Sequence, residues 1–211
     1  MKLPPLYLIT DGERLGEEEL VSRVQAAARG GELMIQLREK QLSDAAFAAL
    51  YQRLRGCLAG SVKIIVNRRV QLVDKLGVDG LQLGAPPDTI RSARNRIPSS
   101  AVIGYSAHEV GEAVAAEHEG ADFLCYSPVF PTISKISPLS PVGTEGLHEA
   151  CQAVGIPVYA LGGIAPENVA TVKRAGARGI AVIGAVLDAP DPQEAVAALL
   201  QSWRQVETPP K

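Results

Sequence analysis

The stretch LYLITDGERLGEEELVSRVQAAARGGELMIQL, residues 6–37, holds two short apolar runs on either side of an amphipathic segment. The runs 6–10 and 33–37 are almost continuously apolar, which is typical of strands that are buried on both faces. Between them, Leu20 and Val24 fall on one face of a helix whose first turn is acidic. The stretch therefore predicts a strand, a helix and a second, parallel strand.

The same alternation continues along the rest of the chain. In LSDAAFAALYQRLRG, Ser43 is in position to cap the first turn of a helix, and in PENVATVKRAGA, Pro166 lies near a helix start and Gly176 near its end. Eight strand–helix units predict an α/β fold, a (β/α)8 TIM barrel that forms a single domain over residues 1–211. The six further strands are expected at 63–67, 80–84, 102–106, 122–127, 157–161 and 179–184.

An open, doubly wound sheet is the alternative for this alternation. That fold usually carries a G-x-G-x-x-G turn after its first strand, whereas the turn here reads LITDGERLG. The closed barrel is therefore favoured. The tail ETPPK, residues 207–211, is expected to fray because nothing in it can pack.

Composition excludes several classes of partner. A net charge of −2 and a pI near 6.0 provide no basic surface for nucleic acid. No apolar stretch approaches the roughly 20 residues that span a bilayer, and the first residues do not resemble an export signal. The three cysteines, Cys57, Cys125 and Cys151, are odd in number and widely spaced. They predict reduced thiols in a cytoplasmic protein and no zinc site.

Polar side chains gather where the predicted strands end, which is where barrels of this kind carry their chemistry. Basic side chains at this mouth of a slightly acidic protein indicate an anionic ligand, although solvated residues at helix starts are an alternative interpretation. The candidate binding residues at these ends are Gln36, Arg38, Lys40, Asn67, Arg68, Ser106, Thr132, Ser134 and Lys135.

Glycines follow the last two predicted strands, in ALGGIAPENV and VIGAV. Glycine lets a ligand come close to the backbone, and the helix that follows begins with free N–H groups. The loops after strands seven and eight often bind phosphate in these barrels. Tight turns are the other interpretation, but Thr132, Ser134 and Lys135 add hydroxyls and an ammonium group, so we expect a phosphate site here that includes Gly162, Gly163 and Gly184.

His108 and Lys135 are the candidate catalytic residues. A lone histidine near a helix start is often structural, but its ordinary pKa near neutrality suits it for general-base catalysis. No Ser-His-Asp or Cys-His arrangement can be argued from the spacing of the residues.

Taken in order, the motifs of this chain resemble those of the thiamine phosphate synthase and TenI superfamily, whose members are (β/α)8 barrels. The motifs are LYLITDG, QLREK, VNRRVQLVDKLGVDGLQLG, GYSAHEV, YSPVFPT, ALGGIAPENV and GIAVIGAV. The resemblance covers most of the chain, and QLREK with the P-T-x-[ST]-K loop is its most specific part. It implies a hydroxymethylpyrimidine diphosphate held by Gln36, Arg38, Lys40, Asn67, Ser106 and Lys135. It also implies a thiazole phosphate held by Thr132, Ser134, Gly163, Ile183 and Gly184.

The chain departs from this family at the residues that hold magnesium. The synthase has an aspartate after the asparagine and another where this chain has Pro87, whereas Arg68 and Pro87 stand here. The loss of two hard oxygen ligands predicts no metal site and no cofactor, with magnesium required only if the chain is a synthase. The metal-free pattern looks more like TenI, a thiazole tautomerase. The catalytic histidine of that enzyme aligns with Pro128, so its role cannot be carried over.

These observations predict a metal-free thiazole tautomerase of the TenI type that uses His108 as its base. One alternative is thiamine phosphate synthase, with the Arg68 guanidinium supplying the charge that magnesium normally brings. Another is a non-catalytic binder of thiazole phosphate. All three have a phosphorylated heterocycle as ligand, and the sequence leaves open whether the chain forms a homo-oligomer.

Overall fold

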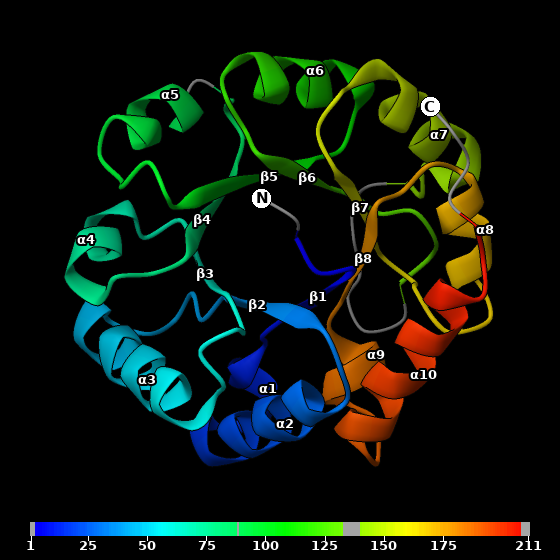
Figure 1. Cartoon of the computed structure of the whole chain (residues 1–211). Coiled ribbons are helices and arrows are strands. Elements are labelled where there is room, and N and C mark those ends of the chain that lie inside the picture. The colour runs from blue at the N-terminus through cyan, green and yellow to red at the C-terminus, as the bar shows by residue number, and fades with distance from the viewer. Residues whose placement is uncertain (1–2, 88, 133–139, 208–211) are drawn as a thin grey trace.

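The computed structural model describes residues 3–87, 89–132 and 140–207, and shows a closed ring of strands inside a ring of helices (Figure 1). Each strand is parallel to both neighbours, and the eighth closes on the first, with Leu6 paired to Leu33 on one side and Ile180 on the other. The predicted (β/α)8 barrel is confirmed. Its strands are β1 Leu6–Ile9, β2 Leu33–Leu37, β3 Ile64–Asn67, β4 Gly80–Gly84, β5 Val102–Ala107, β6 Phe123–Tyr126, β7 Val158–Leu161 and β8 Gly179–Val182.

The helices cover the outside of the barrel (Figure 1). Ser43 caps its helix as predicted, because its side chain accepts a hydrogen bond from the N–H of Ala46 at 3.2 Å. The helices are α1 Gly12–Leu15, α2 Glu17–Arg29, α3 Asp44–Cys57, η1 Val70–Leu72, α4 Val73–Leu76, α5 Thr89–Arg94, α6 Val110–His118, α7 Gly143–Ala153, α8 Val169–Arg174, α9 Gly184–Leu187 and α10 Pro192–Arg204.

One helix starts later than the sequence predicts. α8 begins at Val169 and not near Pro166, because Asn168 closes a turn in front of it. The Asn168 side chain accepts from the N–H of Ala165 at 3.0 Å and donates to the carbonyl of Gly163 at 2.7 Å. The backbone from Gly163 to Asn168 is therefore a fixed loop.

Two apolar layers hold the fold together. The larger lies between the strands and the helices, and it includes Leu20 and Val24 as predicted. The smaller fills the barrel interior, where the rings of Tyr7, Phe123 and Tyr159 meet edge to face at centroid distances of 5.6–6.0 Å. Because these rings plug the barrel, any ligand must bind at its mouth.

Within the described ranges no helix has the length and apolar character needed to cross a membrane. The three cysteines form no disulfide bond with one another. Of the tail predicted to fray, residues 208–211 lie outside the described part of the chain.

Candidate active site

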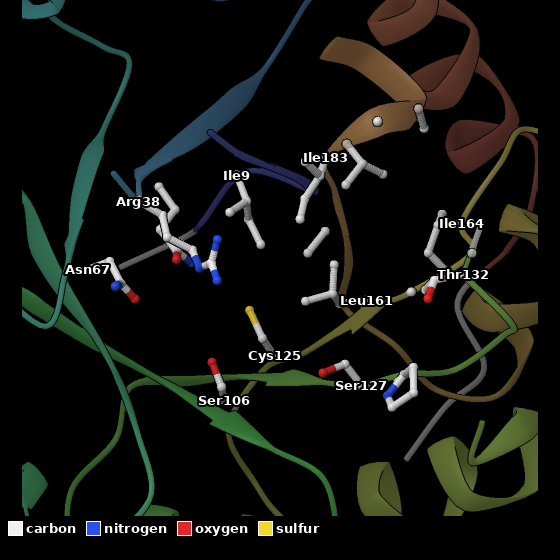
Figure 2. A pocket seen from close by; sticks show the side chains of 18 of the residues that line it. Ile9, Arg38, Asn67, Ser106, Cys125, Ser127, Thr132, Leu161, Ile164 and Ile183 are labelled. Atoms are coloured by element: carbon white, nitrogen blue, oxygen red, sulfur yellow. The ribbon is translucent and has the colours of Figure 1, made fainter. Parts of the chain in front are cut away.

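A cavity of about 950 Å³ opens at the carboxyl ends of the strands (Figure 2). The structure brings nearly all of the predicted site residues to its wall, while Ser134 and Lys135 lie outside the described residues. The predicted residues that line the cavity are Gln36, Arg38, Lys40, Asn67, Arg68, Ser106, His108, Thr132, Gly162, Gly163, Ile183 and Gly184.

Two guanidinium groups on the cavity wall have no partner among the residues that the structure describes. Arg38 follows β2 and Arg68 follows β3, and neither guanidinium makes a hydrogen bond or ion pair with any residue in the described ranges. By contrast, Arg14 on the same wall is held by Asp11 and by both carboxylate oxygens of Asp188. The charges of Arg38 and Arg68 are thus available to an anionic ligand.

The backbone at Arg68 is strained. Its φ of 59° is the one left-handed value of a non-glycine residue in the described chain, and such a conformation costs about 1–2 kcal/mol when a Cβ is present. The N–H of Arg68 donates to the carbonyl of Gln82 at 2.9 Å, which fixes the turn. A Cβ at Gly84 would lie 3.1 Å from Nη2 of Arg68, so this glycine leaves space for the guanidinium. Strain of this kind is common at functional sites.

The residues where the resemblance places magnesium ligands do not fit that ion. Arg68 carries only hydrogen-bond donors, and Pro87 has no side-chain oxygen. No group of three or more His, Cys, Asp or Glu could hold a metal ion among the residues that the structure describes, which do not include Asp88. Magnesium requires oxygen ligands, and neither Arg68 nor Pro87 offers one from its side chain.

On the other side of the cavity, two glycines let the loop after β7 pack closely against the loop after β6. Gly162 and Gly163 have φ values of 101° and 64°, which favour glycine. The N–H of Phe130 donates to the carbonyl of Gly162 at 3.0 Å, joining the loop after β6 to the loop after β7. A Cβ at Gly163 would lie 2.6 Å from the carbonyl oxygen of Pro131. A side chain at position 163 is therefore excluded by both backbone conformation and lack of space.

The proton on the His108 ring is fixed by its partner. Nδ1 lies 2.6 Å from the carbonyl oxygen of Ser127. A carbonyl can only accept, so Nδ1 carries the hydrogen and Nε2 of the neutral ring is left with a lone pair. The backbone N–H of His108 donates to the Glu112 side chain at 2.7 Å, which ties the residue after β5 to the first turn of α6. His108 lines the cavity and can act there as a base.

Sequence reasoning missed several residues beneath and around the cavity. Tyr7 and Gln82 connect Gln36 to Ser106 through hydrogen bonds. Burial raises the pKa values of Tyr7 and of the cavity-lining Cys125, so both groups stay protonated and Cys125 is no nucleophile at neutral pH. The signal that could have revealed Tyr7 is a tyrosine inside a strand with no exposed face.

Comparisons with known proteins identify the family of this chain. The family described as thiamine monophosphate synthase matches residues 6–186. A relative from Roseiflexus castenholzii, named thiamine-phosphate synthase, is 40% identical over 195 residues, 92% of this chain and 86% of its own. Another, from Desulfitobacterium hafniense strain Y51 and with the same name, is 35% identical over 200 residues, 94% of this chain and 97% of its own.

A solved structure of thiamine phosphate pyrophosphorylase from Pyrococcus furiosus is similar at a TM-score of 0.83, with 35% identity and coverage of 95% of both chains. The fold, the sequence relatives and the solved structure all lead to the same assignment. The chain belongs to the thiamine monophosphate synthase family of enzymes.

Proposed function

We propose that this enzyme is a thiamine-phosphate synthase, which joins hydroxymethylpyrimidine diphosphate to a thiazole phosphate. The observation that carries this proposal is that one cavity has candidate phosphate-binding residues at two opposite ends. Arg38 and Asn67 lie on one side, and Thr132, Ile164 and Ile183 lie on the other (Figure 2). A tautomerase acts on a single phosphorylated substrate and needs only one of these places.

The names of the relatives support the same choice. The sequence alone favoured the tautomerase, because the magnesium-binding aspartates are missing. The relatives and the two-ended cavity favour the synthase, which was the alternative. The three cysteines, which form no disulfide, further support our proposal that the enzyme works in the cytoplasm.

In the proposed reaction, the thiazole ring nitrogen forms a bond to the methylene carbon of the pyrimidine, and the bond from that carbon to the diphosphate oxygen breaks. The electron pair leaves with the diphosphate. Arg38 and Arg68 have no protein partner within the described chain, so they can take up the negative charge that develops on that oxygen. The loop at Gly162 and Gly163 holds the phosphate of the thiazole and so aims its nitrogen.

The test is to incubate the protein with both phosphorylated heterocycles, once with magnesium and once with EDTA. We expect thiamine phosphate and diphosphate to form in equal amounts, and EDTA to leave at least about half of the rate, because guanidinium groups replace the cation. Formation of no product under either condition contradicts the synthase proposal. Activity that requires magnesium keeps the synthase but contradicts the role of Arg68.

His108 supports a second candidate, the thiazole tautomerase. Its Nε2 is the free acceptor of a ring that is oriented by Ser127, as a general base must be. Incubation with the unaromatised thiazole carboxylate phosphate should then produce the aromatic ring faster than buffer does. His108→Asn keeps a donor for the Ser127 carbonyl but has no base, so it should remove the acceleration. If parent and buffer rates are equal, the tautomerase is eliminated, and tight binding without turnover in either assay would favour a binder.

A further inference from the structure

A row of polar side chains crosses the barrel under the cavity. Nε2 of Gln36 donates to the hydroxyl of Tyr7 at 3.2 Å, and that hydroxyl donates to Oε1 of Gln82, also at 3.2 Å. Nε2 of Gln82 in turn donates to Oγ of Ser106 at 3.0 Å. Tyr7, Gln36 and Gln82 are at most 3% exposed. Burial of so many polar groups in an apolar interior is costly, so the row must have a use at the cavity or in the fold.

The two ends of the row have opposite hydrogen-bonding character. The Tyr7 hydroxyl has a single hydrogen, which goes to Gln82 because Gln36 already donates to the oxygen. Ser106 accepts from Gln82, so its own hydrogen is free to donate into the cavity. Oε1 of Gln36 has no hydrogen-bond partner among the described residues, so it is free to accept. To exchange donor for acceptor at either end, the amides of Gln36 and Gln82 and the hydroxyl of Tyr7 would have to rotate together.

The barrel reserves space for this row. A Cβ at Gly104 would overlap both Oε1 of Gln82 and the ring of Phe123. The absence of a side chain on β5 at that level therefore allows the Gln82 amide to lie between Tyr7 and Ser106.

We propose that Tyr7 and Gln82 are positioning residues, which couple Gln36 to Ser106 so that the cavity presents an acceptor at one and a donor at the other. The site then selects a heterocycle that offers a hydrogen-bond donor to Gln36 and an acceptor to Ser106. This inference rests on the proposed function, in which the pyrimidine substrate is the heterocycle concerned.

Tyr7→Phe tests the coupling, because it keeps the ring among Phe123 and Tyr159 and removes only the hydroxyl. Loss of this hydroxyl should raise KM for hydroxymethylpyrimidine diphosphate about tenfold and leave KM for thiazole phosphate within about twofold. Tyr159→Phe is the matched control. Its hydroxyl belongs to the same ring cluster but donates to the carbonyl of Pro4 at 2.6 Å, away from the cavity. Both KM values should stay unchanged in this control.

A double-mutant cycle separates positioning from loss of stability. In the parent, Gln36→Leu and Ser106→Ala should be coupled by at least about fivefold in KM for the pyrimidine substrate. In the Tyr7→Phe background this coupling should fall below about twofold, because the link between the two residues is cut. Equal coupling in the two backgrounds overturns the inference, even if thermal stability falls in both.

Calorimetry with hydroxymethylpyrimidine diphosphate distinguishes failure of this inference from failure of the proposed function. A parent that turns over, with unchanged affinity in Tyr7→Phe, overturns the inference and leaves the synthase standing. A parent that binds this probe without turnover overturns the synthase, and an affinity about tenfold weaker in Tyr7→Phe then still supports the coupling. A parent that does not bind the probe overturns both.

Discussion

Arg68→Gly is expected to lower the synthase rate about a thousandfold while the folded protein becomes slightly more stable. In phosphoryl transfer, an arginine that stabilises the developing charge contributes roughly 10³–10⁵ in rate. The proposed reaction transfers no phosphoryl group, but comparable charge develops on the departing diphosphate, and Arg68 is one of two guanidinium groups on the cavity wall without a partner among the described residues. The loss should fall mainly on kcat, because the charge on the departing diphosphate is largest in the transition state.

The gain in stability follows from the backbone. Glycine accepts the φ of 59° at position 68 without strain. Relief of about 1–2 kcal/mol is partly offset by the larger entropy of glycine in the unfolded chain, so the free energy of unfolding should rise by at most about 1 kcal/mol. For a chain of this length the melting temperature would rise by no more than about 4 °C. Steady-state kinetics and thermal unfolding measure the two effects on one preparation.

Arg69→Ala is the control, because Arg69 is the next residue but does not line the cavity. Its guanidinium pairs with Asp44 and lies 4.5 Å from the ring centroid of Phe47. This variant should lose stability and keep its rate, which is the opposite of Arg68→Gly. A rate that falls equally in both variants would show that the loop, and not the Arg68 charge, is responsible.

Gly163→Ala should weaken binding of thiazole phosphate at least about a hundredfold, because the methyl group would overlap the Pro131 carbonyl and push apart the loops after β6 and β7 that form this side of the cavity. It should also destabilise the fold by about 3 kcal/mol, since a left-handed φ and an overlap with the Pro131 carbonyl add together. Calorimetry with thiazole phosphate and denaturant unfolding are the measurements.

Gly77→Ala separates strain from binding. Gly77 has a similar φ of 60°, but a Cβ there would meet no atom within 4 Å, and the residue does not line the cavity. This control should lose only about 1 kcal/mol of stability and keep its affinity for thiazole phosphate. If Gly163→Ala binds as tightly as the control, the glycine loop does not hold the phosphate.

The sequence was sufficient for the barrel because short apolar runs alternate with amphipathic segments along the chain. It was also sufficient to place side chains such as Arg38 and Ser106 at the cavity, because the carboxyl ends of all parallel strands lie at the same end of the barrel. It did not reveal the link through Tyr7 and Gln82, because that link depends on which interior residues of distant strands come level once the barrel closes. The sequence also could not distinguish a tautomerase from a synthase. The lack of a carboxylate at position 68 argues only against a magnesium ligand there.

The pairing of β8 with β1 has a consequence for how this protein is made. During translation β1 is the first strand to emerge from the ribosome, and β8, one of its two neighbours, is the last. The pairing of Leu6 with Ile180 therefore forms only after most of the chain has been made. During that time β1 and the newest strand are both unprotected sheet edges, which are prone to pair with other chains. Gly184 follows β8, so the ligand cavity also becomes complete only in the final stage of synthesis. Chaperones that shield nascent strands should therefore affect the yield of this protein more than its finished stability would suggest.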